Sequence, residues 1–429
     1  MAVIKAFKGM RYNTAKAGEI SSLCCPPYDI ISEQERLAFI KENKYNIIRL
    51  ELPKEGENPY ACASDILKMW QDKGILKIED KPAIYIYEEE FSVGNTRKSI
   101  KGIIARVQLE EFSKGIILPH EFTLSKAKED RLNLMKATNC NFSQIYALYM
   151  DEKHTTLATI DERSKAKADL EFTDETGVTH RLWIETDEGI IAKLVADFAD
   201  RKLYIADGHH RYETALNYRN YCRENGISKP GDPQDFQMIY LVDMEHPGLV
   251  VFPTHRLVRD LPNFDKEAVL EKCSEFFYID EKEGTDTMEE DLKKLYDEGK
   301  KAFGFYCGKG EWFLLTLKNI DFMSQMLPDV SKATQSLDVS VLHTLILEKI
   351  FGIDKENMAK QINLTYTKFF TEAIDGVDKG EFQCSFVLNP TRVTEIRDVA
   401  AAGEKMPQKS TYFYPKMITG MVMNNLGVD

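Results

Sequence analysis

Short blocks of apolar residues, some alternating with polar ones and some spaced by three or four, predict a chain of mixed strands and helices. In the first half we predict strands at 45–52, 83–91, 99–109 and 143–150, and helices at 60–73, 126–136 and 188–199. Gly94 and Asn95 join two of these strands into a hairpin, and residues 151–185 are polar and hairpin-like. Ser32 and Glu35 have the spacing of a capping box and indicate a further helix that starts near Ser32.

The pattern changes near residues 260–263. Strands are predicted before this point at 236–242 and 249–253, and after it we predict a helix from Asp265, a strand at 276–279, a helix at 288–298, a hairpin at 302–317, a helix at 339–351 and a strand at 384–389. This β-α-β-β order is typical of a separate α+β unit. Because 429 residues exceed what one compact core needs, we expect two domains, 1–262 and 263–429.

Composition narrows the classes of protein to which the chain can belong. Hydrophobic residues make up 43% and charged residues 29% of the sequence, as in folded globular proteins, and the net charge of −13 gives no overall attraction to nucleic acid or anionic lipid. The eight cysteines lack the paired spacing of disulfide frameworks. No apolar run approaches the length of a membrane span, and charges interrupt the N-terminal residues, so we expect a cytoplasmic protein without a signal peptide.

Polar residues gather where a predicted strand stops and a predicted helix begins, within residues 202–216. They are Asp207, Gly208, His209, His210 and Arg211. The first turn of a helix presents unpaired amides and the positive end of its dipole, Gly208 lets the backbone approach closely, and Arg211 can pair with a phosphate. Asp-Gly is also a common turn, and a histidine at a helix start often only caps its neighbours, but a run of five such residues favours a ligand site.

Two upstream loops supply further candidate acids and bases. Asp29 follows a rigid Pro-Pro-Tyr stretch, and His120 and Glu121 follow Pro119. Each loop is explained equally well as an ordinary exposed turn. We therefore count Asp29 and Glu121 with Asp207 and the two neighbouring histidines as catalytic candidates, and His120 as a candidate phosphate contact.

Residues 403–411 come near the phosphate-binding loop of nucleotide enzymes. Gln408 stands where that loop needs a glycine, and residues 412–415 are a poor helix start, so the phosphate cradle is not expected there. Lys409 and Ser410 remain candidate ligand contacts.

The histidines do not predict a zinc site. His209 and His210 are neighbours and would diverge by about 100° on a helix, which disfavours joint chelation. Mg²⁺ bound through phosphate oxygens and one carboxylate leaves little trace in a sequence, and Asp207 is the candidate metal ligand.

Residues 207–212, with Pro-Pro-Tyr-Asp at 26–29 and Leu-Pro-His-Glu at 118–121, resemble a widespread bacterial family of unknown function labelled ParB-like, over nearly the full chain. The Asp-Gly-His-His-Arg stretch is also similar to the nucleotide-phosphate loop of the ParB/sulfiredoxin superfamily, which includes free-serine kinases. The resemblance implies an α/β (α+β) ParB/sulfiredoxin-like N-terminal domain with insertions, because the motif arrives only at residue 207, and a smaller α+β C-terminal domain. The residues that it assigns to phosphate or nucleotide are Gly208, His209, His210, Arg211 and Tyr212, and Asp207 would act on a metal ion or a hydroxyl.

From the resemblance we expect a phosphotransferase that moves a phosphoryl group between a nucleotide, ADP or ATP, and a small hydroxyl substrate, with Mg²⁺ bridging the phosphate oxygens. Free serine or phosphoserine, and hence serine synthesis, is the best candidate. A phosphoserine phosphatase is the close variant, in which water accepts the phosphoryl group. The rival class is a nucleotide-gated ParB-type DNA-binding or partition protein, against which the acidic charge and the β-α-β-β order argue. A third alternative is a regulatory small-molecule sensor without turnover. The sequence leaves the oligomeric state undecided, with a homodimer as one alternative.

Overall fold

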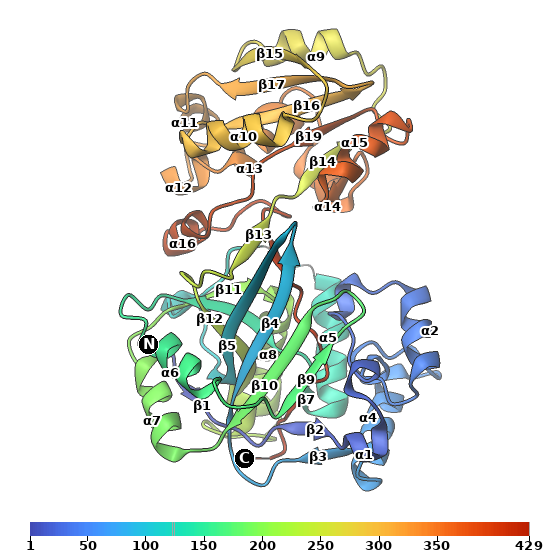
Figure 1. Ribbon diagram of the computed structural model, residues 1–429, viewed down its shortest axis with the longest axis vertical. Coiled ribbons are helices and arrows are strands. Elements are labelled where there is room, and N and C mark those ends of the chain that lie inside the picture. Colours follow the sequence, from blue (N-terminus) through green and yellow to red (C-terminus); the bar gives the residue numbers. More distant parts are fainter. Residues whose placement is uncertain (122, 124, 429) are drawn as a thin grey trace. The chain divides into compact units, whose positions relative to one another are not determined.

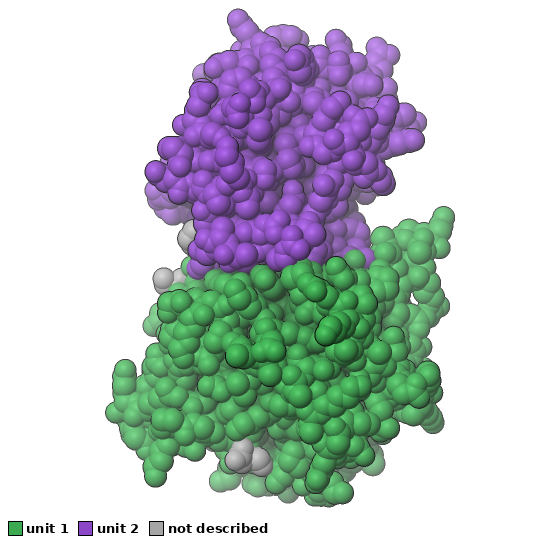
Figure 2. Space-filling model, turned by 90° about the vertical axis from the view of Figure 1, so that its left-hand side faces the viewer, with its two compact units in different colours: residues 1–119, 123–249, 415–429 green, residues 120–122, 250–414 purple. Residues whose placement is uncertain are grey.

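The computed structural model describes residues 1–121, 123 and 125–428, and the chain divides into two compact units. The first unit comprises Met1–Pro119, Thr123–Leu249 and Pro415–Asp429, and the second comprises Val250–Tyr414 with His120 and Glu121. Figure 2 shows the units in separate colours. The chain therefore leaves the first unit after Leu249 and returns to it at Pro415, a return that the predicted division into 1–262 and 263–429 does not contain.

The first unit is built on a mixed sheet of nine described strands (Figure 1). Their order is β6-β11-β8-β12-β5-β4-β10-β9, with β1 beside β5. The strands are β1 (Ile4–Lys5), β4 (Ile84–Val93), β5 (Thr96–Gln108), β6 (Ile117–Leu118), β8 (Ile145–Tyr149), β9 (Leu170–Thr173), β10 (Thr179–Glu185), β11 (Leu203–Asp207) and β12 (Phe236–Asp243). The pairs β6–β11 and β8–β12 are parallel. The predicted β4–β5 hairpin and the strands β8 and β12 are confirmed.

Helices lie on and beside this sheet, and short strand pairs lie outside it. The helices are α1 (Thr14–Ala17), α2 (Glu33–Glu42), α3 (Ile48–Glu51), α4 (Pro59–Asp72), α5 (Ser125–Thr138), α6 (Thr155–Arg163), α7 (Glu188–Asp197) and α8 (His209–Glu224). The pairs are β2 (Met10–Tyr12) with β3 (Leu76–Ile78), and β7 (Cys140–Asn141) with β21 (Asn424–Asn425). Ala215 of α8 is buried in one apolar cluster with Ile145, Ile205 and Ile239 of the sheet, which holds α8 in place. The capping box at Ser32 is confirmed.

Two expectations for the first unit were wrong. Residues 45–52 contain the short helix α3 (Ile48–Glu51) and no strand. Asn46 decides this locally, because its side-chain oxygen accepts from the Ile48 amide at 2.9 Å and its amide group donates to the carbonyls of Ser22 and Cys24 at 2.9 Å each. A short apolar run that is buried on every side fits a helix as well as a strand. Only the later part of residues 151–185 forms a hairpin, β9–β10, because helix α6 occupies Thr155–Arg163.

The second unit is an antiparallel sheet with helices. Its strand order is β15-β17-β16-β19-β14-β18. The strands are β14 (His255–Val258), β15 (Phe277–Glu283), β16 (Ala302–Gly308), β17 (Glu311–Leu317), β18 (Leu364–Thr367) and β19 (Cys384–Val387), and β13 (Val250–Phe252) pairs with β20 (Tyr412–Tyr414). The helices are α9 (Lys266–Cys273), α10 (Met288–Asp297), α11 (Asp321–Met326), α12 (Lys332–Gln335), α13 (Asp338–Val341) continued by a π-helix (Leu342–Glu348), α14 (Lys355–Lys360), α15 (Phe370–Asp378) and α16 (Val393–Ala401). In the part of the chain that is described, no helix of either unit has the length and apolarity needed to cross a membrane.

The C-terminal segment is built into the first unit. Asn424 and Asn425 pair with Asn141 and Cys140 as two short strands. The fully buried Arg106 donates to Asn424 Oδ1 at 2.9 Å and to the Asn425 carbonyl at 3.1 Å. These contacts join β5 to residues more than three hundred positions later, so the first unit needs both ends of the chain.

Candidate functional site

The end of β11 and the start of α8 form the junction that the sequence singles out. Gly208 lies between them with φ +95°, a conformation that favours glycine. A Cβ at this position would lie 3.0 Å from both Nε and Nη2 of Arg211, so the Arg211 guanidinium folds back over Gly208. The first intrahelical bond runs from the Tyr212 amide to the Gly208 carbonyl at 3.0 Å. The positive end of the α8 dipole and the Arg211 guanidinium therefore lie together at the start of α8.

Asp207 is held as a carboxylate between two cations. Lys416 Nζ lies 2.7 Å from its Oδ2, and Arg211 Nη2 lies 3.9 Å from its Oδ1. Burial on its own would raise the pKa of Asp207, but Lys416 and Arg211 outweigh burial and lower it well below the usual range. Asp207 is therefore ionised at neutral pH.

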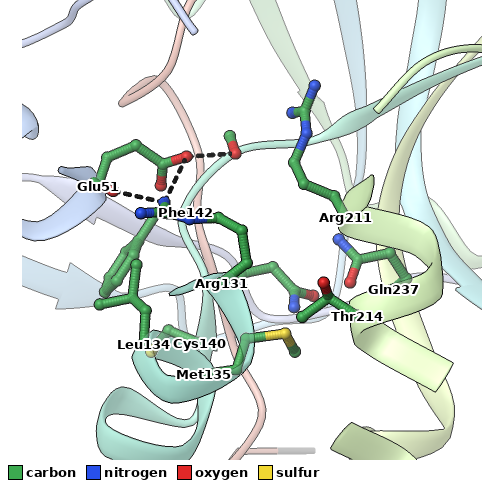
Figure 3. Close-up of a pocket in the computed structure, with 11 residues that line it drawn as sticks. Glu51, Arg131, Leu134, Met135, Cys140, Phe142, Arg211, Thr214 and Gln237 are labelled. Carbon is green, nitrogen blue, oxygen red and sulfur yellow. Dashed lines mark hydrogen bonds and ion pairs between the residues drawn. The ribbon is translucent and has the colours of Figure 1, made fainter. Parts of the chain in front are cut away.

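A pocket opens beside Arg211, with about 360 Å³ of empty space including its open side. Its polar lining consists of Glu51, Arg131, Asn141, Ser143, Arg211, Thr214 and Gln237. Its apolar lining consists of Leu134, Met135, Cys140 and Phe142. Figure 3 shows Glu51 and Arg131 on one side of the pocket and Arg211, Thr214 and Gln237 on the other. The lining comes from α3, α5, β7 and the loop after it, α8 and β12.

Glu51 is a buried carboxylate in this pocket. Its side chain is 3% exposed, the Ser143 hydroxyl donates to Oε1 at 2.8 Å, and Arg131 Nη1 lies 3.7 Å from the same oxygen. Burial raises the pKa of Glu51 and is only partly offset by Arg131, the Ser143 hydrogen bond and Arg211. A carboxyl group with a raised pKa beside a cationic pocket can exchange protons with a bound ligand.

Arg131 fixes the position of Glu51. It donates to the Glu51 carbonyl at 2.5 Å and to Asp130 Oδ2 at 2.9 and 2.6 Å, and its guanidinium lies 4.1 Å from the ring centroid of Tyr28. Burial would lower the pKa of Arg131, but Glu51, Asp130 and Tyr28 raise it, so it stays charged. The Pro-Pro-Tyr loop that the sequence singles out therefore reaches the site through Tyr28, whereas Asp29 is exposed.

His210 is a partly buried imidazole near Asp29. Burial lowers its pKa most strongly, Asp29 and Glu213 act in the opposite direction, and Lys128 and Arg211 add to the lowering. Glu213 accepts hydrogen bonds from Lys128 Nζ and Thr123 Oγ1, both at 2.7 Å. The imidazole is therefore neutral at neutral pH. Its neighbour His209 is 4% exposed.

Tyr212 has its hydroxyl committed to the core of the first unit. It is fully buried, and its hydroxyl donates to the Glu110 carbonyl at 2.8 Å and accepts from the Glu110 amide at 2.9 Å. The ring belongs to the same apolar cluster as Ala215. These contacts make Tyr212 a core side chain that anchors α8, in contrast to the phosphate contact that the resemblance implies.

Four other candidates belong to the second unit. His120 is fully buried, its Nε2 lies 3.2 Å from Thr411 Oγ1 and its carbonyl accepts from the Met406 amide at 2.7 Å. Glu121 follows it in the same unit. The carbonyl of the exposed Lys409 accepts from Arg256 at 3.0 Å, and the buried Ser410 donates to the Pro407 carbonyl at 2.5 Å. The hydroxyl of Ser410 and the carbonyl of Lys409 thus serve the internal structure of this unit.

Arg211 is the one residue of the described pocket lining that the sequence singles out, and Glu51 and Arg131 are the charged residues that it missed. Glu51 lies in residues 45–52, where the pattern predicts a strand, and a carboxylate between Leu50 and Leu52 is the one signal that could have identified it. Arg131 sits in a helix with many charges, where nothing distinguishes it from a solvated side chain.

A resident metal ion finds few ligands here. Across residues 1–121, 123 and 125–428, no three His, Cys, Asp or Glu side chains converge as a metal site would require. The carboxylate of Asp207 is engaged by Lys416. A magnesium ion at this site would therefore depend mainly on ligand phosphate oxygens.

Comparisons with known proteins agree with the motif at the level of the family. Residues 4–340 match the model of the family described as "Protein of unknown function (DUF1015)", and no curated protein matches the chain. Matching solved structures include a conserved hypothetical protein from Pyrococcus furiosus, with 16% identity over 73% of this chain and 93% of that chain at a TM-score of 0.35. A free serine kinase in complex with AMP has 14% sequence identity, covering 70% of this chain and 84% of that chain, at a TM-score of 0.36. SbnI with a C-terminal truncation from Staphylococcus aureus has 11% sequence identity, covering 74% of this chain and 86% of that chain, at a TM-score of 0.34.

Proposed function

We propose that this chain, which belongs to the DUF1015 family, is a phosphotransferase that moves a phosphoryl group between a nucleotide and a small hydroxyl substrate. The observation that carries the proposal is the presence in one pocket of a buried carboxylate, Glu51, and of Arg211 at the N-terminal end of α8. A base for the hydroxyl proton and a cation with a helix end for the phosphoryl group are the two functions that this reaction needs.

The end of α8 binds the transferring phosphoryl group in this proposal. Arg211 supplies a guanidinium, and the first helical turn supplies the positive end of the dipole. Gly208 leaves room for the ligand and the Arg211 guanidinium to approach the backbone, since even a methyl group at this position would lie 3.0 Å from the guanidinium. The resemblance of residues 207–212 to the nucleotide-phosphate loop of the ParB/sulfiredoxin superfamily supports the same assignment, and with it ADP or ATP as the nucleotide.

Glu51 acts as the base. As the substrate oxygen attacks the terminal phosphorus of the nucleotide, its proton passes to Glu51, and the bond from that phosphorus to the leaving oxygen breaks to release the shortened nucleotide. Arg131 and Ser143 hold the carboxylate in place, at 3.7 and 2.8 Å from Oε1. Asp29, whose charge contributes to raising the pKa of Glu51, and His210 have no assigned step.

The chemistry of the pocket supports a small amino acid as the hydroxyl substrate. The Arg211 guanidinium complements a carboxylate or phosphate, and Glu51 complements an ammonium or hydroxyl group. Free serine or phosphoserine, which the motif implies, has these groups on a few atoms. Mg²⁺ would be held mainly by the nucleotide phosphates and would supply charge neutralisation there, because Asp207, the candidate metal ligand of the sequence, is engaged by Lys416.

The test is an assay of the full chain with phosphoserine, Mg²⁺ and either ADP or water, in which serine, ATP and inorganic phosphate are measured. ATP formed together with serine supports the phosphotransferase. Inorganic phosphate formed without ATP makes the same site a phosphoserine phosphatase. Neither product, together with no transfer from ATP to serine or other small hydroxyl amino acids, overturns the proposal.

A further inference from the structure

A lysine far along the chain completes the charge balance around Asp207. Lys416 Nζ lies 2.7 Å from Asp207 Oδ2, although 209 positions separate the two residues in sequence. Arg211 Nη2 lies 3.9 Å from the other oxygen of the same carboxylate. The exposed fractions of the Lys416, Asp207 and Arg211 side chains are 19%, 25% and 13%. Two cations therefore share one partly buried carboxylate at the N-terminal end of α8.

The segment that carries Lys416 is anchored within the first unit. Thr419 exchanges two backbone hydrogen bonds with Cys25, at 2.8 and 3.1 Å, and Gln144 Nε2 donates to the Ile418 carbonyl at 2.9 Å. The backbone carbonyl of Gln144 in turn accepts a hydrogen bond from Arg211 Nη1. Gln144 thus links the segment of Lys416 to the side chain of Arg211. This segment lies beyond residues 4–340, the part of the chain that matches the family model.

We propose that Lys416 is a positioning residue of the phosphate site, which neutralises Asp207 so that Arg211 stays available to a phosphoryl group. Without Lys416, the charges of Asp207 and Arg211 cancel, and the carboxylate attracts the guanidinium away from a ligand. With Lys416, the three side chains carry a net charge of +1, which adds to the positive end of the α8 dipole. The identity of the ligand in this proposal rests on the proposed function.

The test measures binding of ADP and of inorganic phosphate to the full chain by calorimetry, at one pH and one salt concentration. Lys416→Met should weaken ADP binding by about tenfold or more, since it removes a charge next to a charge-assisted contact. Lys416→Arg keeps the charge and should bind as the wild-type chain does. The double variant Lys416→Met with Asp207→Asn should recover affinity to within about threefold of wild type, because the carboxylate that needed neutralising is gone.

The outcomes separate the role of Lys416 from the proposed function. A double variant as weak as Lys416→Met alone overturns the proposal, because Lys416 then contacts the ligand or only stabilises the segment. Wild-type affinity in Lys416→Met overturns it as well. A wild-type chain that binds neither ADP nor phosphate overturns the proposed function itself. Thermal unfolding of each variant identifies a loss of folding, and rescue by Asp207→Asn cannot arise from a purely structural role of Lys416.

Discussion

Replacing Glu51 by Gln should remove most of the activity while the fold persists. Gln has nearly the same shape and can still accept a hydrogen bond from the Ser143 hydroxyl, which lies 2.8 Å from Oε1. It cannot take up the proton of the substrate hydroxyl. General-base catalysis typically contributes about 10²–10⁴-fold, so we expect kcat to fall by about that factor with little change in KM for the nucleotide.

The same substitution has a limited effect on stability, which the distances allow us to estimate. Two unit charges 3.7 Å apart, as in Arg131 and Glu51, attract each other by about 4 kcal/mol at an effective dielectric constant of about 20. The burial that raises the pKa of Glu51 offsets most of this attraction. Asp130 remains beside Arg131, so we expect Glu51→Gln to lower the free energy of unfolding by only about 1–2 kcal/mol.

Glu89 provides a matched control for this prediction. It is 2% exposed, burial raises its pKa as it does that of Glu51, and it accepts a hydrogen bond from the Tyr87 hydroxyl at 3.1 Å on strand β4, outside the pocket lining. The assay is steady-state phosphoryl transfer at saturating nucleotide, with urea unfolding of both variants. Full activity in Glu51→Gln, or an equal loss in Glu89→Gln, would refute the assignment of the base.

The pH profile gives a second measurement on the same residue. Because the pKa of Glu51 is raised above its ordinary value of 4.5, the base is protonated, and kcat falls, at a higher pH than for an exposed glutamate. This acid limb should be absent from the residual activity of Glu51→Gln. A limb that persists unchanged in the variant belongs to another group.

Four further predictions concern the rest of the site. Gly208→Ala should destabilise the chain by about 1–3 kcal/mol in urea unfolding, because φ is +95° and a Cβ would lie 3.0 Å from Arg211 Nε. Gly226→Ala is the control that measures the backbone strain alone, since φ is +68° there and a Cβ would have no heavy atom within 4 Å. Arg211→Met should weaken ADP binding by about 10–100-fold in calorimetry, and Arg211→Lys should restore only part of it, since an ammonium lacks the paired donors. Burial lowers the pKa of His210, so the folded chain binds this proton less tightly than the unfolded chain does. The folded chain therefore loses stability as the pH falls below 6.5. His210→Gln should remove this contribution and flatten that part of the curve of unfolding free energy against pH. EDTA should stop phosphoryl transfer and excess Mg²⁺ should restore it, whereas transfer that continues in EDTA would exclude a role for the metal.

The local elements near the site could be predicted because short-range physics decides them. Residues 203–216 contain an apolar strand, a glycine that permits a positive φ and a helix with one apolar face, and the structure has β11, Gly208 and α8 in these places. The capping box at Ser32 and the hairpin at Gly94 are local in the same sense. The prediction at 45–52 was wrong because an apolar run that short carries no period that separates a helix from a strand.

The sequence by itself determined the chemistry of one junction and the mixed character of the chain, since both follow from residues that are neighbours along the backbone. Only the tertiary structure decided which carboxylate and which cations join that junction. Glu51, Arg131 and Lys416 come from a short helix, a long helix and the returning C-terminal segment, and no spacing in the sequence relates them. Burial and the low effective dielectric constant that comes with it then set the charge states of these groups, and burial exists only once the chain has packed.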